Sequence, residues 1–218
     1  MGSIDLYCER IGPDFWAEPV NALTNASFIV AAWGIWRFAR RTAGPTPDLW
    51  LLIVTAVSIG VGSFLFHTFA NRWSLLCDVV PILVFQLIFL WLYCRRIVGF
   101  SPRLSAVLLA AFLIAAIVFR RFPHVLNGSL IYLPALAVIL ILGIYHLRTA
   151  AVGRFDLLWA GGLLAVSLFF RSIDNLVCPS FQLGTHFIWH LANGGVIYLA
   201  ARAYAAQRPH AHGQSAFS

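Results

Sequence analysis

Long apolar runs, separated only by short polar segments, constrain this sequence more than any other feature. The runs cover 21–40, 49–70, 74–94, 104–119, 129–147, 156–172 and 184–204. A helix of about 20 apolar residues crosses the hydrocarbon core of a bilayer, so this pattern predicts seven membrane spans. The expected fold is an all-α polytopic membrane protein, a bundle of seven transmembrane helices.

Composition agrees with a bilayer as the solvent. Of 218 residues, 61% are hydrophobic and 11% are charged, which is far from the usage of soluble domains. Seven spans with short loops fill residues 1–206, so we expect one membrane domain there and a disordered cytoplasmic tail at 207–218. The net charge of +7 comes from arginines scattered between the runs. That dispersal argues against nucleic acid as a partner.

The arginines also indicate an orientation. Ten of the fifteen fall on the face that holds the loops 37–48, 95–103 and 148–156 and the C-terminal end. The five on the other face are Arg10, Arg72, Arg120, Arg121 and Arg171. The positive-inside rule therefore predicts a cytoplasmic C-terminus and an N-terminus outside the cell or in a lumen.

Four ionisable side chains interrupt the apolar runs, namely His67, Asp78, His186 and His190. Such groups are costly in lipid and commonly mark a functional site. Counted from the predicted span ends at 1.5 Å per residue, all four lie within roughly 10 Å of the outer face. Three helices are therefore expected to bring polar groups to one level.

The spacing of these residues favours a metal. His186 and His190 are one helical turn apart, so both rings can face one ion, and His67 can supply a third nitrogen. Three protein ligands with one open position are typical of catalytic zinc. Asp78 can orient a ligand or accept a proton from the zinc-bound water, and Ser63 shares a helix face with His67. The alternatives are hydrogen-bonded packing histidines and, for Ser63, a small residue at a helix contact.

Four sequence blocks resemble the alkaline ceramidase family, within the wider group of seven-span membrane hydrolases that includes the adiponectin-type receptors. The blocks are YCER at 7–10, AEPVNALTN at 17–25, GSFLFHTFANRWSLLCDVVPI at 62–82, and DNLVC at 174–178 followed by GTHFIWH at 184–190. They spread over nearly the whole chain. The serine, histidine and aspartate of the third block and the later histidine pair are highly specific in combination.

The resemblance implies that His67, His186 and His190 bind zinc, that Asp78 activates water and that Ser63 stabilises the oxyanion. The implied reaction is hydrolysis of the amide bond of ceramide, or of a related N-acyl lipid, to a sphingoid base or amine lipid and a fatty acid. The alternative is a receptor or signalling protein on the same scaffold with structural zinc. A transporter would instead carry ionisable residues near the bilayer midplane.

The resemblance further implies a calcium site and a disulfide in the outer segment. Glu9 and Glu18 match calcium carboxylates of the family and Asp5 stands near a third, although Ile11 occupies the place of an amide ligand. The alternative is that Glu9, Asp14 and Glu18 form a solvated acidic face. Cys8 and Cys178 lie in blocks that are disulfide-linked in the family.

These inferences place the chain in a membrane as a multi-pass protein. The expected membrane is a bacterial inner membrane or one of the endoplasmic reticulum or Golgi type, with the site near the non-cytoplasmic face. Lipid is the expected partner and substrate, and the sequence does not identify a protein partner.

Overall fold

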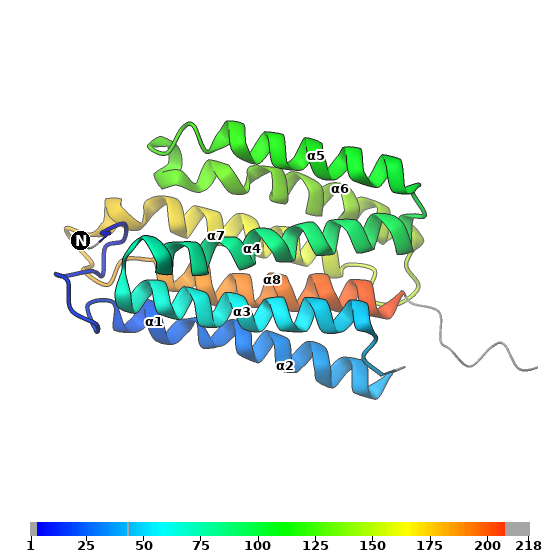
Figure 1. The fold of residues 1–218 in the computed structure, drawn as a ribbon, viewed down its shortest axis with the longest axis horizontal. Helices are drawn as coiled ribbons and strands as arrows, with labels where there is room; N and C mark the ends of the chain where they lie inside the picture. The colour runs from blue at the N-terminus through cyan, green and yellow to red at the C-terminus, as the bar shows by residue number, and fades with distance from the viewer. Residues whose placement is uncertain (1–3, 43, 208–218) are drawn as a thin grey trace, which may run out of the picture.

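The structure, a computed structural model, describes residues 4–42 and 44–207, and this part of the chain is helical with no strand (Figure 1). The α-helices are α1 (Pro19–Thr24), α2 (Ala26–Arg41), α3 (Pro47–Phe69), α4 (Arg72–Tyr93), α5 (Pro102–Phe119), α6 (Leu133–Thr149), α7 (Asp156–Val177) and α8 (His186–Ala206). A π-helical turn, η1 (Cys94–Val98), extends α4, and a 3₁₀ segment, η2 (Val125–Tyr132), precedes α6. All but the first residue of the predicted tail lies outside the described residues.

Each of the seven apolar runs contains most of one long helix, in the order α2 to α8. Some helix boundaries differ from the predicted ones. The first run is divided at Asn25, whose side-chain amide donates to the carbonyl of Asn21 and so competes with regular helix bonding. The fifth run begins in η2, and α7 continues five residues beyond the expected end at 172. The all-helical class is therefore confirmed.

Five of the helical segments are long and apolar enough to cross a membrane by themselves: α3, α4 with η1, α5, η2 with α6, and α7. The other two long helices depart from a simple apolar span. Helix α2 has only 16 residues, and α8 carries two histidines, an asparagine and an arginine within its 21. Polar content in α8 is expected if that helix serves a site rather than facing lipid.

Helix α8 occupies the middle of the bundle, where it contacts α1, α2, α3, α4 and α7 (Figure 1). Helices α3 and α4 form a tight antiparallel pair joined by two residues. Ala70 takes the left-handed conformation that ends α3, and Asn71 caps α4 by accepting from the backbone N–H of Ser74. This short turn holds the end of α3 beside the start of α4.

Two glycines allow the helices around the site to approach closely. A Cβ atom on Gly62 of α3 would lie 1.8 Å from the carbonyl oxygen of Cys77 in α4. A Cβ on Gly194 of α8 would lie 2.9 Å from the carbonyl oxygen of Ser27 in α2. Because backbone atoms fill both positions, any larger residue would force the helices apart.

The opposite end of the bundle is closed by buried polar pairs. Tyr93 and the ring of His146 are hydrogen-bonded at 2.6 Å, and the other ring nitrogen of His146 lies 3.2 Å from the carbonyl oxygen of Gly153. Arg202 donates from Nε and Nη2 to the two carboxylate oxygens of Asp156. The contacts with Tyr93 and Gly153 give His146 a structural role.

We expect Gly62→Ala to destabilise the fold by about 3 kcal/mol or more, since the added methyl meets backbone that cannot rotate away. The measurement is thermal or denaturant unfolding in detergent micelles. Gly162→Ala is the matched control, because no atom beyond the neighbouring residues and backbone of its own helix lies within 4 Å of the added methyl. It should leave stability unchanged or raise it by up to about 1 kcal/mol. Equal effects of the two substitutions would contradict the close α3–α4 contact.

Candidate metal centre

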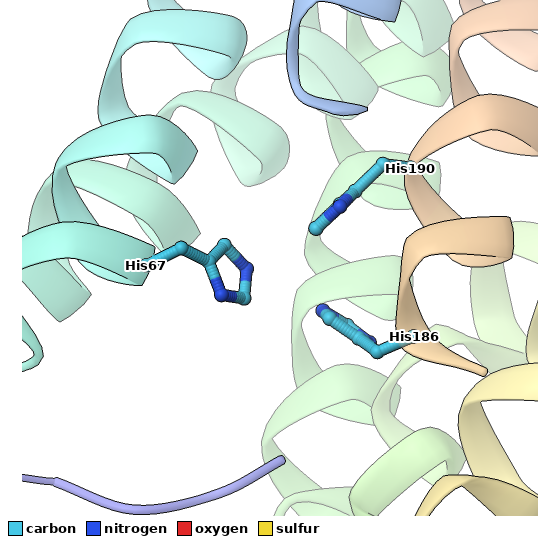
Figure 2. A group of neighbouring side chains, drawn as sticks. All are labelled: His67, His186 and His190. Carbon is cyan, nitrogen blue, oxygen red and sulfur yellow. The ribbon is translucent and has the colours of Figure 1, made fainter. Parts of the chain in front are cut away.

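The three histidines predicted to bind metal meet at one point (Figure 2). His67 comes from the last turn of α3, and His186 and His190 come from the first two turns of α8. The ring centroids are 5.2 Å apart for His67 and His186, 4.8 Å for His67 and His190, and 4.6 Å for His186 and His190. One ligand atom from each ring lies within 4.8 Å of the others. Within the described residues, this is the only such group of three or more.

Each ring keeps one buried nitrogen without a hydrogen-bond partner. These atoms are Nε2 of His67, Nδ1 of His186 and Nε2 of His190, and no ring is more than 2% exposed. A buried polar atom without a partner costs about 1–3 kcal/mol, so three facing one another need a common explanation. A divalent ion satisfies all three nitrogens at once, and the donor set therefore fits a metal.

Hydrogen bonds fix two of the rings in the form that a metal requires. The Glu18 carboxylate, which only accepts, lies 2.5 Å from Nδ1 of His67. Thr24 donates its hydroxyl hydrogen to the Val20 carbonyl and therefore accepts at 2.9 Å from Nδ1 of His190. In His67 and in His190 the ring proton is therefore on Nδ1, which leaves the lone pair of Nε2 free for the ion.

Asp78 and Ser63 join this group from neighbouring helices. Asp78 lies on the second turn of α4 and is 8% exposed, and its Oδ1 is buried without a partner. Ser63, one turn before His67, hydrogen-bonds the Asp78 carboxyl. The structure thus brings both predicted residues together beside the histidines, and the close approach at Gly62 makes this possible.

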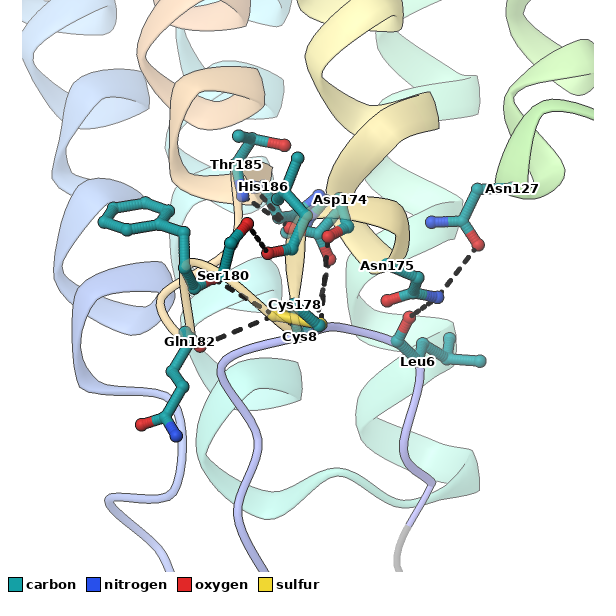
Figure 3. The surroundings of a disulfide bond; sticks show 12 residues. Leu6, Cys8, Asn127, Asp174, Asn175, Cys178, Ser180, Gln182, Thr185 and His186 are labelled. Carbon is teal, nitrogen blue, oxygen red and sulfur yellow. Dashed lines mark hydrogen bonds between the residues drawn. A yellow bond between two sulfur atoms is a disulfide. The ribbon is translucent and has the colours of Figure 1, made fainter.

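The predicted disulfide between Cys8 and Cys178 is present and ties the N-terminal segment to the end of α7 (Figure 3). Beside it, the buried Asp174 carboxylate accepts backbone N–H groups of Cys8 at 2.9 Å, Thr185 at 2.6 Å and His186 at 2.9 Å. One carboxylate therefore fixes both the N-terminal segment (residues 4–18) and the first residue of α8. Asp174 is not among the site residues predicted from the sequence.

Two further residues near the histidines were also missed. The Tyr7 ring stacks on His186, with centroids 3.5 Å apart and planes 13° apart. The Arg171 guanidinium lies over the rings of Tyr7, Tyr132 and Trp189 and donates to the carbonyl of Asn127. Their only sequence signals were membership in YCER and an arginine count by face, neither of which predicts contact with the site.

The residues suggested for calcium do not form one oxygen cage. Both Glu9 oxygens accept backbone N–H groups of helix α1, from Val20 and Asn21, each at 2.7 Å. Burial raises the pKa of Glu9, which those bonds partly offset. Burial also acts to raise the pKa of Glu18, but the hydrogen bond from His67 and the charge of Arg10 oppose it, and the pKa of Glu18 is lowered.

Asp5, the third suggested ligand, is exposed, and so is the apolar Ile11. The two glutamates are buried, so the alternative of a solvated acidic face does not describe them. Calcium needs six to eight oxygen ligands, and the Glu9 and Glu18 oxygens already accept protein donors. These side chains therefore do not fit calcium as they stand.

Fold and site together define a helical protein of membrane character with a buried three-histidine cluster. A family model described as Ceramidase matches residues 6–216, nearly the whole chain. The chain therefore belongs to the ceramidase family, which confirms the resemblance and implies an amidohydrolase. A comparison with curated proteins found no match.

We expect the purified protein to bind one divalent ion per chain and His190→Ala to reduce this to near zero, because two imidazoles hold such an ion far less tightly. Elemental analysis by mass spectrometry measures the content. The control is His124→Ala, an exposed histidine outside the cluster. Full metal content in the His190 variant would contradict the assignment.

Proposed function

We propose that this protein is a zinc-dependent amidohydrolase of the lipid bilayer that cleaves ceramide or a related N-acyl lipid. One observation carries the proposal: three buried histidines whose ligand atoms lie within 4.8 Å of one another each keep a ring nitrogen without a partner. The Asp78 carboxyl, which interacts electrostatically with His67 and hydrogen-bonds Ser63, also keeps a buried oxygen without a partner. Membership in the ceramidase family supports the amide bond as the target.

Zinc is the ion we propose, since three neutral imidazoles with an open fourth position are its usual catalytic ligand set. When bound, it supplies a Lewis acid that polarises the substrate carbonyl and lowers the pKa of water. His67, His186 and His190 would hold it, with Glu18 and Thr24 orienting two of the rings.

Asp78 is the proposed general base. Its Oδ1 is buried without a partner, so it can accept a proton from the attacking water and later deliver it to the leaving amine. Ser63 is the proposed oxyanion donor, and its present bond to Asp78 keeps the hydroxyl on the side of the site. A structural zinc, as in the receptor alternative, would leave the position of this carboxylate unexplained.

An apolar cavity beside the histidines suits the acyl chain of the substrate. On α8 it extends from Trp189, next to His190, to Ala200, about 16 Å along the helix. Phe85 and Phe112 are among its apolar lining, and the few polar side chains there include Asn193. We propose that a fatty acyl chain lies in this cavity with its amide at the Trp189 end, the end nearest to His190 along α8.

We also propose the membrane arrangement: residues 1–206 form one seven-span hydrolase domain with the N-terminus and the site on the non-cytoplasmic side. Five candidate spans and the central, partly polar α8 support it. The disulfide lies at the same end as the histidines, and an oxidising compartment favours such a bond. The distribution of arginines agrees.

Asp78→Asn should keep bound metal and lower turnover by about 10²- to 10⁴-fold, because the amide cannot act as a base. Mass spectrometry of products from a panel of N-acyl lipids, with and without chelator, measures activity, and elemental analysis measures metal. Asp48→Asn, at the other end of α3, is the matched control and should remain active. Cleavage by metal-free protein, or full activity of the Asp78 variant, would refute the proposal.

The orientation has its own test. A membrane-impermeant maleimide should label Asp14→Cys in intact cells but Arg148→Cys only after permeabilisation, since both positions are exposed and lie at opposite ends of the bundle. The unchanged protein, with Cys8 and Cys178 paired, controls for labelling of Cys77 and Cys94. The reverse pattern would place the site on the cytoplasmic side.

A further inference from the structure

An arginine is buried directly behind the histidine cluster. Arg10, in the N-terminal segment before α1, is 5% exposed, and its guanidinium donates through all three nitrogens. Nε bonds Glu18 Oε1 at 2.5 Å, Nη1 bonds the Gly12 carbonyl at 3.3 Å, and Nη2 bonds the His67 carbonyl at 2.9 Å. A buried charge needs such compensation, so the side chain is firmly placed.

The guanidinium is one end of a continuous chain of contacts to the proposed metal. Arg10 holds Oε1 of Glu18, Oε2 of Glu18 holds Nδ1 of His67, and Nε2 of His67 faces the cluster. Arg10 also contacts the backbone of the same histidine. Arg10 therefore contacts the backbone of His67 directly and the ring of His67 through Glu18.

The Arg10 guanidinium supplies the positive charge that a calcium ion would otherwise supply beside Glu18. All four oxygens of Glu9 and Glu18 accept protein donors, and the Arg10 charge balances Glu18. A second cation would have to displace Arg10 from Glu18 or take Glu9 from the start of helix α1. Both steps break charge-assisted bonds in a buried setting.

We propose that Arg10 is a built-in cation that replaces calcium in this chain and acts as a positioning residue for the zinc ligand His67 through Glu18. Zinc binding is then independent of calcium. Neutralising Arg10 leaves Glu18 without its counter-charge and loosens the ring of His67. The proposal rests on the proposed zinc site but not on the reaction catalysed there.

The test measures the zinc dissociation constant of metal-free, disulfide-intact protein in detergent, by competition with a chromophoric chelator. For the unchanged protein we expect the same constant with and without millimolar calcium, and no stoichiometric calcium by equilibrium dialysis. Arg10→Gln should raise the zinc constant about tenfold or more, as loss of a partner behind a ligand commonly does. Arg10→Lys, which keeps the charge, should recover part of that loss.

Arg72→Gln is the matched control, because Arg72 is an exposed arginine at the same end of the bundle. It should bind zinc as the unchanged protein does. One bound calcium per chain, or zinc binding by the unchanged protein that requires calcium, would overturn the proposal without any variant. Wild-type zinc affinity in Arg10→Gln would overturn it too. Zinc binding as expected with no lipid cleavage would refute the proposed reaction alone.

Discussion

Burial of imidazole nitrogens that no protein group satisfies is the constraint around which this bundle is organised. Two of the three rings are oriented from behind by an acceptor, Glu18 or Thr24, which leaves the opposite nitrogen open. Folding would lose free energy at each open nitrogen unless something binds there. The sequence tolerates that loss three times at one point, which is the signature of a site kept for a ligand.

The long helices and the level of the four ionisable residues could be predicted from the sequence, because both follow from the positions of the apolar runs. Seven apolar runs gave the helices, and counting residues from their ends placed His67, Asp78 and the α8 histidines at one level. The identity of the ion, the number of spans and the orientation remain predictions. Boundaries were less accurate because local polar groups set them, as the side chain of Asn25 does between α1 and α2.

The residues behind the site were not readable in the same way. Glu18 reaches His67 across 49 residues of sequence, and Asp174 reaches Cys8 across 166. No local pattern encodes such pairs. Arg10 and Arg171 were counted only as outer-face charges, whereas both turn inward, one to Glu18 and one over aromatic rings. Contacts of this kind depend on how the N-terminal segment folds back over the helix ends.

The N-terminal segment connects the helix ends that carry the histidines. The disulfide and Asp174 anchor it to α7 and α8, and Glu9 caps α1. Between those anchors, Arg10 and Glu18 meet the last turn of α3. Because α3 and α8 supply different ligands, the ion can be held only if the two helix ends keep a fixed separation. A cross-linked segment with its own internal cation does this with protein groups alone.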